Sequence, residues 1–212
     1  MPSSAELLRS VFTIANALVP VAIAWHIAIA VALVAIVAGW RPSVRVALVL
    51  VAAPALSVSI CSFAYGNPFN GISLAVLAAL FAAFARATRA GEIARHARWS
   101  AWLGAALIAF GIVYPHFVTG SWLRYVYAAP VGVLPCPTLS LIAGFTLLAG
   151  GFRGRAVSAV LAAWTAFYAV FGITRLGVTI DAALVAATVG LLAVSVRGIR
   201  LHSPRGAHGY SG

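Results

Sequence analysis

The residues with the most distinctive chemistry lie in a proline-rich stretch between Pro130 and Gly151. Three prolines fall within eight residues there, and Cys136 sits between Pro135 and Pro137. Proline lacks a backbone N–H and fits the first turn of a helix, so we predict irregular backbone up to Cys136 and a helix from Pro137. The free N–H groups and the dipole at a helix start favour a thiolate, which makes Cys136 a candidate reactive thiol.

A second group of candidates consists of side chains that bind soft metal ions. These are Cys61, Cys136, His26 and His116, which we place toward one side of the membrane. Thiolate and imidazole are ligands that soft metals prefer, so a metal or thiol site is one hypothesis. The spacing contains no Cys-x-x-Cys pair. The alternatives are a disulfide between Cys61 and Cys136, a histidine that hydrogen-bonds between helices, and cysteines that act as small apolar fillers.

Further polar residues on that side favour a transport site instead. A helix interrupted between Pro130 and Thr138 leaves backbone N–H and carbonyl groups free to bind a small solute. Asp181 and Arg175 lie six residues apart across a turn and form a candidate gate or coupling pair. Asn67 lies in another turn on the same side. The structural alternative is that Asp181 caps its helix and Arg175 meets lipid headgroups.

The composition indicates a membrane protein and excludes several kinds of enzyme. Of the 212 residues, 63% are hydrophobic and 8% are charged, whereas soluble domains carry about 25% charged residues. The chain has fourteen arginines and no lysine, which excludes a Schiff-base lysine and a phosphate-loop lysine. Because it has a single aspartate and no Gly-x-Ser-x-Gly motif, we expect neither an intramembrane protease nor another enzyme, and no cofactor.

The hydrophobic segments predict an all-α bundle of seven membrane spans in one integral membrane domain, residues 1–212. We expect residues 4–18 to form an interfacial helix or an extension of the first span, and residues 197–212 a cytoplasmic tail. The fifth span is short for a hydrocarbon core of about 30 Å, so six spans is the alternative if that segment is re-entrant. The predicted spans are 20–40, 44–65, 69–87, 99–114, 137–151, 156–173 and 178–196.

The distribution of arginines predicts the orientation of these spans. If the turn after the first span is cytoplasmic, the inside segments hold eleven arginines and the outside segments hold three. Basic residues are enriched in cytoplasmic loops of membrane proteins. We therefore expect the N-terminus outside and the C-terminus inside, with the cytoplasmic arginines contacting anionic lipid headgroups rather than nucleic acid.

The sequence Leu-Pro-Cys-Pro-Thr at residues 134–138, followed by an apolar helix, resembles the hallmark of a bacterial family of uncharacterised multi-pass membrane proteins. Three further features of that family are matched by Asn16 with Pro20, by Asn67-Pro68 and by Tyr114-Pro115. The resemblance covers most of residues 5–195. It implies a helical fold in a bacterial inner membrane and no established activity, and it points to Pro135, Cys136, Pro137 and Thr138 as the residues to test.

These features lead to one main hypothesis for function and two alternatives. We expect a small-solute permease or binding protein of the bacterial inner membrane that uses the proline-interrupted helix near Pro130–Thr138. The first alternative is a metal- or thiol-handling membrane protein that uses Cys136 with Cys61 or histidines. The second is a structural or assembly partner. We expect a lipid bilayer around the protein, and the sequence leaves open whether it forms a homo-oligomer.

Overall fold

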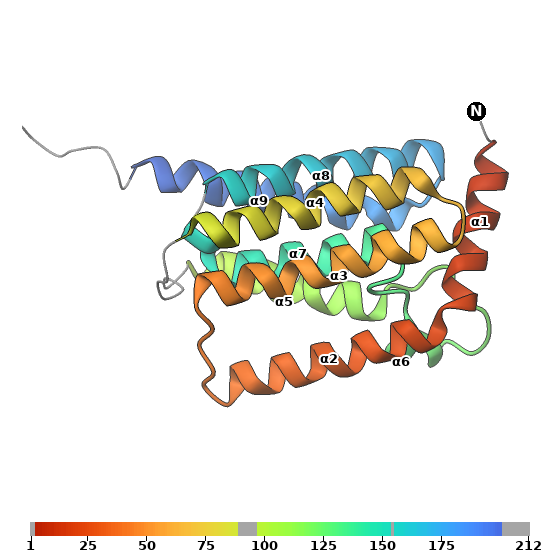
Figure 1. The fold of residues 1–212 in the computed structure, drawn as a ribbon, viewed down its shortest axis with the longest axis horizontal. Helices are drawn as coiled ribbons and strands as arrows, with labels where there is room; N and C mark the ends of the chain where they lie inside the picture. The colour runs from red at the N-terminus through yellow and green to blue at the C-terminus, as the bar shows by residue number, and fades with distance from the viewer. Residues whose placement is uncertain (1–2, 89–96, 154, 201–212) are drawn as a thin grey trace, which may run out of the picture.

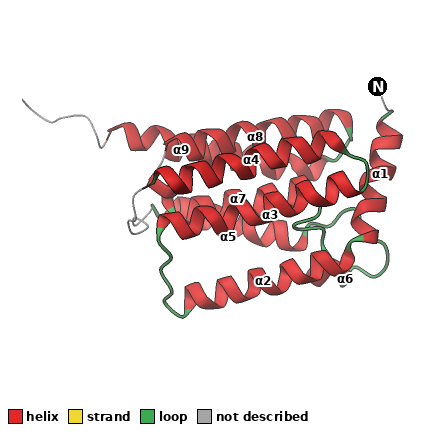
Figure 2. Ribbon diagram, viewed as in Figure 1, coloured by secondary structure: helices red, strands yellow, loops and turns green. Residues whose placement is uncertain are grey.

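The described part of the chain is helical throughout. The computed structural model describes residues 3–88, 97–153 and 155–200, and no strand occurs among them (Figures 1 and 2). The α-helices are α1 (Ser4–Ala17), α2 (Val19–Val37), α3 (Val44–Ala64), α4 (Pro68–Ala87), α5 (Arg98–Val113), α6 (Arg124–Ala128), α7 (Pro135–Leu148), α8 (Arg155–Arg175) and α9 (Ala182–Arg200). Two short 3-10 helices, η1 (Gly150–Arg153) and η2 (Thr179–Asp181), precede α8 and α9.

Five described segments are long and apolar enough to cross a membrane. They are α2, α3, α4, α8 and the segment Thr179–Val196, which includes the start of α9. Helices α5 and α7 are also apolar but have only 16 and 14 residues. Both run alongside the long helices in one bundle (Figure 1). The structure therefore confirms the predicted all-α class, with five helices of membrane-spanning length.

Several helices begin where the sequence offers a capping side chain. The Ser43 hydroxyl accepts a hydrogen bond from the backbone N–H of Val46 at 3.3 Å, at the start of α3. The Asn67 side chain accepts one from the N–H of Asn70 at 3.2 Å, at the start of α4, where Pro68 is the first residue. Such bonds satisfy N–H groups that have no partner within the helix. Asn67 thus has a structural role in this turn.

Several predicted span boundaries differ from the helix ends, and two of these differences concern the candidate site and the C-terminal segment. Helix α7 begins at Pro135, two residues before the predicted start at Pro137, because Pro135 itself fits the first helical position. Helix α9 continues to Arg200, past the predicted end of the last span at residue 196 and into the segment predicted to be a cytoplasmic tail. Residues 201–212 of that tail lie outside the described part of the chain.

Helix α7 lies at the centre of the bundle. Most of its residues are buried, and it packs against α3, α5, α8 and α9. Its closest neighbour is α5, since a Cβ added to Gly144 would lie 2.6 Å from the carbonyl oxygen of Gly104. Likewise, a Cβ added to Gly111 would lie 2.8 Å from the carbonyl oxygen of Pro137. The two short helices are therefore packed backbone against backbone, which only small residues permit.

Helix α1 crosses one end of the bundle instead of running along it (Figure 1). It is separate from α2, because Leu18 between them has non-helical backbone angles, φ −106° and ψ 24°. A capping box opens it: the Ser3 hydroxyl accepts from the N–H of Glu6 at 3.3 Å, and the Ser3 N–H donates to the Glu6 carboxylate at 2.7 Å. The Ser3 N–H and the Ser3 hydroxyl both donate to the Glu6 carboxylate, and these two bonds lower the pKa of Glu6 below its ordinary value. We call the end that α1 covers the α1 end.

The side chain of Asn16 fixes α1 to the rest of the protein. Its amide nitrogen donates to the carbonyl oxygen of Phe117 at 2.9 Å. Its amide oxygen accepts from the backbone N–H of Thr119 at 3.0 Å and from the Thr119 hydroxyl at 2.7 Å. Ile14 and Ala15 are buried on the inner face of α1. Helix α1 is thus held by polar contacts at its end and by apolar packing along one side.

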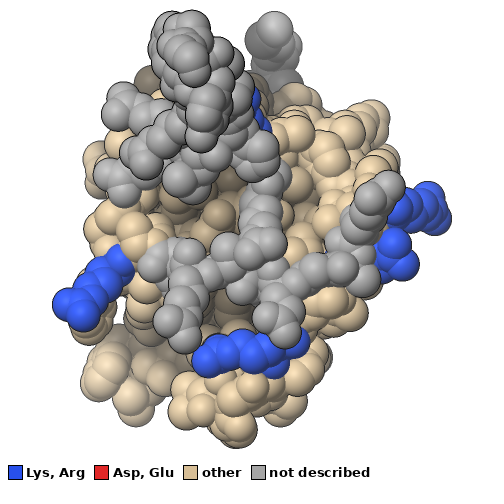
Figure 3. Space-filling model, turned by 90° about the vertical axis from the view of Figure 1, so that its left-hand side faces the viewer, with Lys and Arg blue, Asp and Glu red and all other residues tan. Residues whose placement is uncertain are grey.

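The opposite end of the bundle is rich in arginine. Exposed arginines gather there at the ends of α2, α3, α4, α5 and α8, namely Arg41, Arg45, Arg86, Arg98 and Arg155. Figure 3 looks onto this end and shows basic side chains around its rim. The Nε of Arg45 also donates to the carbonyl oxygen of Ala85 at 3.1 Å, near the end of α4. Of the other arginines predicted on this side, Arg89, Arg95 and Arg205 lie outside the described residues.

Candidate functional site

The only aspartate of the sequence, Asp181, is buried at the α1 end of the bundle. It is the last residue of η2, directly before α9, and only 1% of its surface is exposed. Gly172 on α8 leaves the space for its carboxylate, because a Cβ at this glycine would overlap Asp181 Oδ2. The Asp181 carboxyl can therefore occupy this place inside the apolar bundle only because Gly172 has no side chain.

Both oxygens of the Asp181 carboxylate accept hydrogen bonds from other elements. The Tyr114 hydroxyl donates to Oδ1 at 2.7 Å, and the Cys136 thiol donates to Oδ2 at 3.2 Å. Tyr114 directly follows α5, and Cys136 is the second residue of α7. We call these three residues the Asp181 cluster. It joins the ends of three helices that are far apart in the sequence.

Aromatic rings surround the tyrosine of the Asp181 cluster. Tyr114 is fully buried. The Phe110 ring meets it edge-on with centroids 5.5 Å apart, and the Phe117 ring is stacked at 6.3 Å. Phe117 reaches this place through a positive φ of 71°, an uncommon angle for a residue with a side chain. The hydroxyl of Tyr114 is therefore aimed at Asp181 by packing of its ring on both sides.

The proline-rich segment before α7 is held rigidly by the threonine of the predicted motif. The Thr138 hydroxyl accepts from the N–H of Gly132 at 2.8 Å and donates to the carbonyl oxygen of Leu134 at 2.7 Å. Thr138 is fully buried, so these bonds are not shared with water. Thr138 thus fixes the loop that precedes Cys136.

Two other helices hold the same loop from the opposite side. The indole N–H of Trp25 on α2 donates to the Ser57 hydroxyl on α3 at 2.9 Å. Ser57 in turn donates to the carbonyl oxygen of Gly132 at 2.7 Å. Gly132 has a φ of +72°, and a Cβ there would overlap the Trp25 ring. The irregular segment is therefore packed against side chains, and its polar backbone groups are partly satisfied by them.

The structure separates the side chains predicted to bind a metal. Both ring nitrogens of His26 lie near backbone carbonyl oxygens, those of Ala22 at 2.8 Å and Ile112 at 2.9 Å. The His116 ring lies edge-on to Phe117. Among the residues described, no three histidine, cysteine or carboxylate side chains are close enough to hold a metal ion together.

The disulfide alternative is wrong, since Cys61 and Cys136 are both free thiols. Cys61 is buried on α3. Cys136 instead meets Asp181, a residue that we had paired with Arg175. Arg175 is exposed at the end of α8, while Asp181 is buried and bonded to the other two members of its cluster. The position of Arg175 agrees with the alternative in which it meets headgroups.

The chemistry open to the Asp181 cluster follows from its charge. A hydroxyl and a thiol each stabilise a carboxylate by donating a hydrogen bond, but neither carries the positive charge that would neutralise it. A carboxylate away from water and without a cation is strongly disfavoured. The cluster can therefore exchange a proton or a cation at Asp181.

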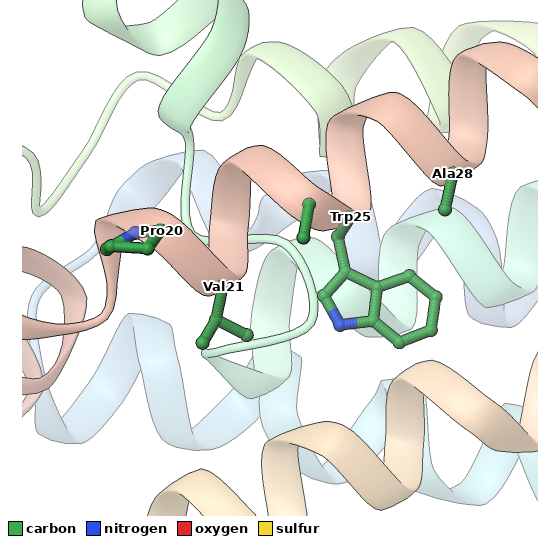
Figure 4. A pocket seen from close by; sticks show the side chains of 5 residues that line it. Pro20, Val21, Trp25 and Ala28 are labelled. Carbon is green, nitrogen blue, oxygen red and sulfur yellow. The ribbon is translucent and has the colours of Figure 1, made fainter.

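The groove found in the described surface is apolar and does not reach the Asp181 cluster. It is open, has a volume of about 470 Å³, and is lined by Pro20, Val21, Ala24, Trp25 and Ala28 of α2 (Figure 4). In contrast, the segment from Pro130 to Pro135 is buried throughout. The loop is thus solidly packed in this conformation.

Sequence reasoning missed Tyr114 as a site residue and missed the meeting of Asp181 with Cys136. The available signals were the Tyr114-Pro115 pair and the uniqueness of Asp181 in the sequence. Neither signal says which helix ends are neighbours, so neither could assemble the cluster.

Comparison with family models, curated proteins and solved structures gives no match for this chain. The class is therefore defined by the fold and the site: an all-helical protein with five helices of membrane-spanning length and a buried carboxylate at one end of the bundle. The resemblance of residues 134–138 to an uncharacterised family stays a prediction.

Proposed function

We propose that this protein is a small-solute permease of a bacterial inner membrane and that Asp181 is its coupling group. The observation that carries the proposal is the buried carboxylate of Asp181, bonded to Tyr114 and Cys136. Inserting an aspartate at the centre of a membrane helix costs about 2.5–3.5 kcal/mol. Ionisable groups at membrane depth commonly mark ion or substrate pathways, and this one is placed where three helix ends meet.

The proposed topology has seven spans, with the N-terminus outside and the C-terminus in the cytoplasm. Five spans are the long apolar helices, and α5 and α7 are the two short ones. The gathering of exposed arginines at one end supports the orientation, because basic residues favour the cytoplasmic side and its anionic headgroups. The Asp181 cluster would then face the outer side, beneath α1.

In the proposed cycle, Asp181 alternates between a neutral and a charged form. Tyr114 and Cys136 stabilise the charged form by hydrogen bonds, and proton uptake weakens both bonds. Because α1 covers this end, access from outside requires α1 to move. The packed loop between Pro130 and Pro135 closes the site in the conformation described here. A permease must pass through such a closed conformation between its two open ones.

The experiment that tests the proposal is current measurement on proteoliposomes adsorbed to a solid-supported membrane. Organic cations, organic acids, amino acids, sugars and polyols are applied as separate panels at several pH values. We expect a pH-dependent transient current from at least one panel with the wild-type protein. The current should vanish in Asp181→Asn and persist in Glu6→Gln, which removes an exposed carboxylate that does not belong to the cluster. Because an exchange of one cation for one proton carries no net charge, the pH inside the vesicles is followed in parallel with an entrapped indicator. Absence of both a current and a pH change from every panel refutes the permease.

A second candidate function is thiol chemistry at Cys136, favoured by its 3.2 Å contact with Asp181. A negative charge beside a buried thiol disfavours the thiolate, so the thiol becomes nucleophilic only when Asp181 is neutral. With Cys61→Ser as background, Cys136 should then react with a methanethiosulfonate reagent at least tenfold slower than in the double variant with Asp181→Asn. Equal rates count against this function. If the protein has a purely structural or assembly role, as a monomer or homo-oligomer, replacing Asp181 should change neither the current nor the rate of thiol modification.

A further inference from the structure

The wall around the Asp181 carboxylate is aromatic and apolar. The ring of Tyr114 is flanked by Phe110 and Phe117, and Val178 belongs to the same buried cluster. Faces of aromatic rings attract organic cations through their quadrupole, most strongly where water is excluded. The carboxylate is bonded to the hydroxyl of a tyrosine within this aromatic cluster, and such a place is suited to a positive charge that carries apolar groups.

The basic side chains at the α1 end are engaged elsewhere or point to solvent. Arg9 and Arg175 are exposed, and the guanidinium of Arg124 donates to the carbonyl oxygen of Thr119 at 2.6 Å. His26 and His116 face backbone carbonyls and the Phe117 ring respectively. These side chains do not neutralise the charge of Asp181, so a proton or a ligand has to do so.

Helix α1 supplies the apolar contacts that such a ligand would replace. Ile14 and Ala15 belong to the same buried cluster as Tyr114 and Phe117. The helix is held at Asn16 and adjoins α2 through the non-helical residue Leu18. Movement about Leu18 would uncover the aromatic wall without disturbing the long helices. The ligand would then take the volume that apolar side chains of α1 fill in this structure.

From this combination we propose that the substrate class of the Asp181 site is a monovalent organic cation with apolar substituents, bound in exchange for a proton. This inference rests on the proposed permease function and names its substrate class. The positive centre lies against the Asp181 carboxylate, and the apolar substituents lie against Tyr114, Phe110 and Phe117. Binding to the protonated site releases one proton to water, so charge balances: a neutral carboxyl and a cation give an ion pair and a free proton.

Other ligand classes fit the site less well. Hard divalent cations take six or more oxygen ligands, whereas the cluster offers one carboxylate, one phenol and one thiol. Anions are repelled by Asp181. A neutral polar solute such as a sugar gains little from aromatic walls that carry one hydroxyl group.

The test uses purified full-length protein in detergent and two probes of equal size and opposite charge. Tetraphenylphosphonium binding is measured by equilibrium dialysis, and proton release is followed with a pH indicator in weakly buffered solution. Tetraphenylborate is the matched anion. At a pH low enough to protonate Asp181, we expect saturable binding of the cation with release of about one proton and an apparent affinity that weakens tenfold for each unit by which the pH is lowered. At a pH where Asp181 is ionised, the cation should bind without releasing a proton. Tetraphenylborate should not saturate or release protons.

Three variants locate the site. Asp181→Asn should reduce cation affinity at least tenfold and abolish proton release. Phe110→Leu keeps an apolar side chain. It should weaken the affinity for the cation several-fold and leave the number of released protons unchanged. Glu6→Gln should change neither. Each variant is first checked for cooperative thermal unfolding, so that a misfolded protein is not counted.

The outcomes separate the inference from the function that it rests on. Equal binding of both probes, or unchanged cation binding in Asp181→Asn, overturns the cation site. If the cation fails while another solute panel gives Asp181-dependent currents, the substrate class is wrong and the permease stands. If no panel gives current and the cation does not bind, both are overturned.

Discussion

The hydrogen bond between Tyr114 and Asp181 offers the sharpest test of the cluster's energetics. Tyr114→Phe removes one oxygen atom from a fully buried ring and leaves the ring packing in place. No water can readily replace the hydroxyl there. A hydrogen bond to a charged group contributes about 1.5–3 kcal/mol, and a bond between neutral groups about 0.5–1.5 kcal/mol. We therefore expect Tyr114→Phe to lower the free energy of unfolding by about 1.5–3 kcal/mol if Asp181 is ionised.

A matched control is available on another helix. Tyr168 is also buried, and its hydroxyl donates to the neutral amide oxygen of Asn70 at 3.0 Å. Tyr168→Phe removes the same atom from a bond of similar length, so the expected loss is about 0.5–1.5 kcal/mol. The difference between the two variants isolates the charge of the acceptor.

The assay is reversible unfolding in mixed micelles with increasing mole fraction of dodecyl sulfate, followed by circular dichroism. The cycle is completed by measuring Tyr114→Phe in the Asp181→Asn background, where the loss should fall to the neutral range. The reasoning is refuted if Tyr114→Phe costs no more than Tyr168→Phe at pH 8, or if its cost is unchanged by Asp181→Asn. Either result would mean that Asp181 is not charged in the folded protein.

Three further substitutions test other contacts of the structure. Gly172→Ala places a Cβ on the Asp181 carboxylate, so we expect a loss of about 1–3 kcal/mol of unfolding free energy, measured by the same micelle titration. Gly144→Ala presses on the backbone carbonyl of Gly104, which cannot rotate away, so a loss at least as large is expected in that titration. Asn16→Ala removes the bonds that fix α1, so hydrogen exchange should become faster in residues 4–17 and stay unchanged in α7.

Controls for these three variants come from the same chain. At Gly190 an added Cβ would meet the ends of leucine side chains, which can move, so Gly190→Ala should be milder than either of the other glycine variants. Asn67→Ala removes a helix cap from α4 and should leave exchange in α1 unchanged. If Gly190→Ala is as damaging as Gly172→Ala, or if Asn16→Ala slows or spares exchange in α1, the corresponding contact does not act as described.

The sequence was most informative where local chemistry decides structure. Hydrophobic segment length predicted the helical membrane class, since few other structures bury their backbone polar groups in lipid. The proline-rich stretch correctly indicated irregular backbone followed by a helix, although the helix begins at Pro135 and not at the predicted Pro137. Asn67 with Pro68 correctly marked a turn before a helix, where the asparagine now caps α4. Each of these predictions needed only neighbouring residues.

The site could not be predicted, because it depends on which helix ends are neighbours. Asp181 lies 67 positions from Tyr114 and 45 positions from Cys136. Three helix starts or ends meet there, and an apolar helix carries little sequence information about its partner. The pairing of Asp181 with Arg175 relied on sequence proximity, yet one side chain is buried and the other is exposed. The predicted metal ligands are likewise not gathered in the described residues, where His26 lies against backbone carbonyls.

The shortness of the central helix has an electrical consequence. A helix of 14 residues rises about 21 Å, well below the hydrocarbon thickness of about 30 Å. The buried loop before α7 and the longer helices around it make up the remaining thickness, so the membrane voltage falls across packed protein at this place. Moving one elementary charge through 100 mV changes its free energy by about 2.3 kcal/mol. A charge that leaves Asp181 and passes along α7 would cross most of that voltage, so the occupancy of the site should respond to membrane potential as well as to pH.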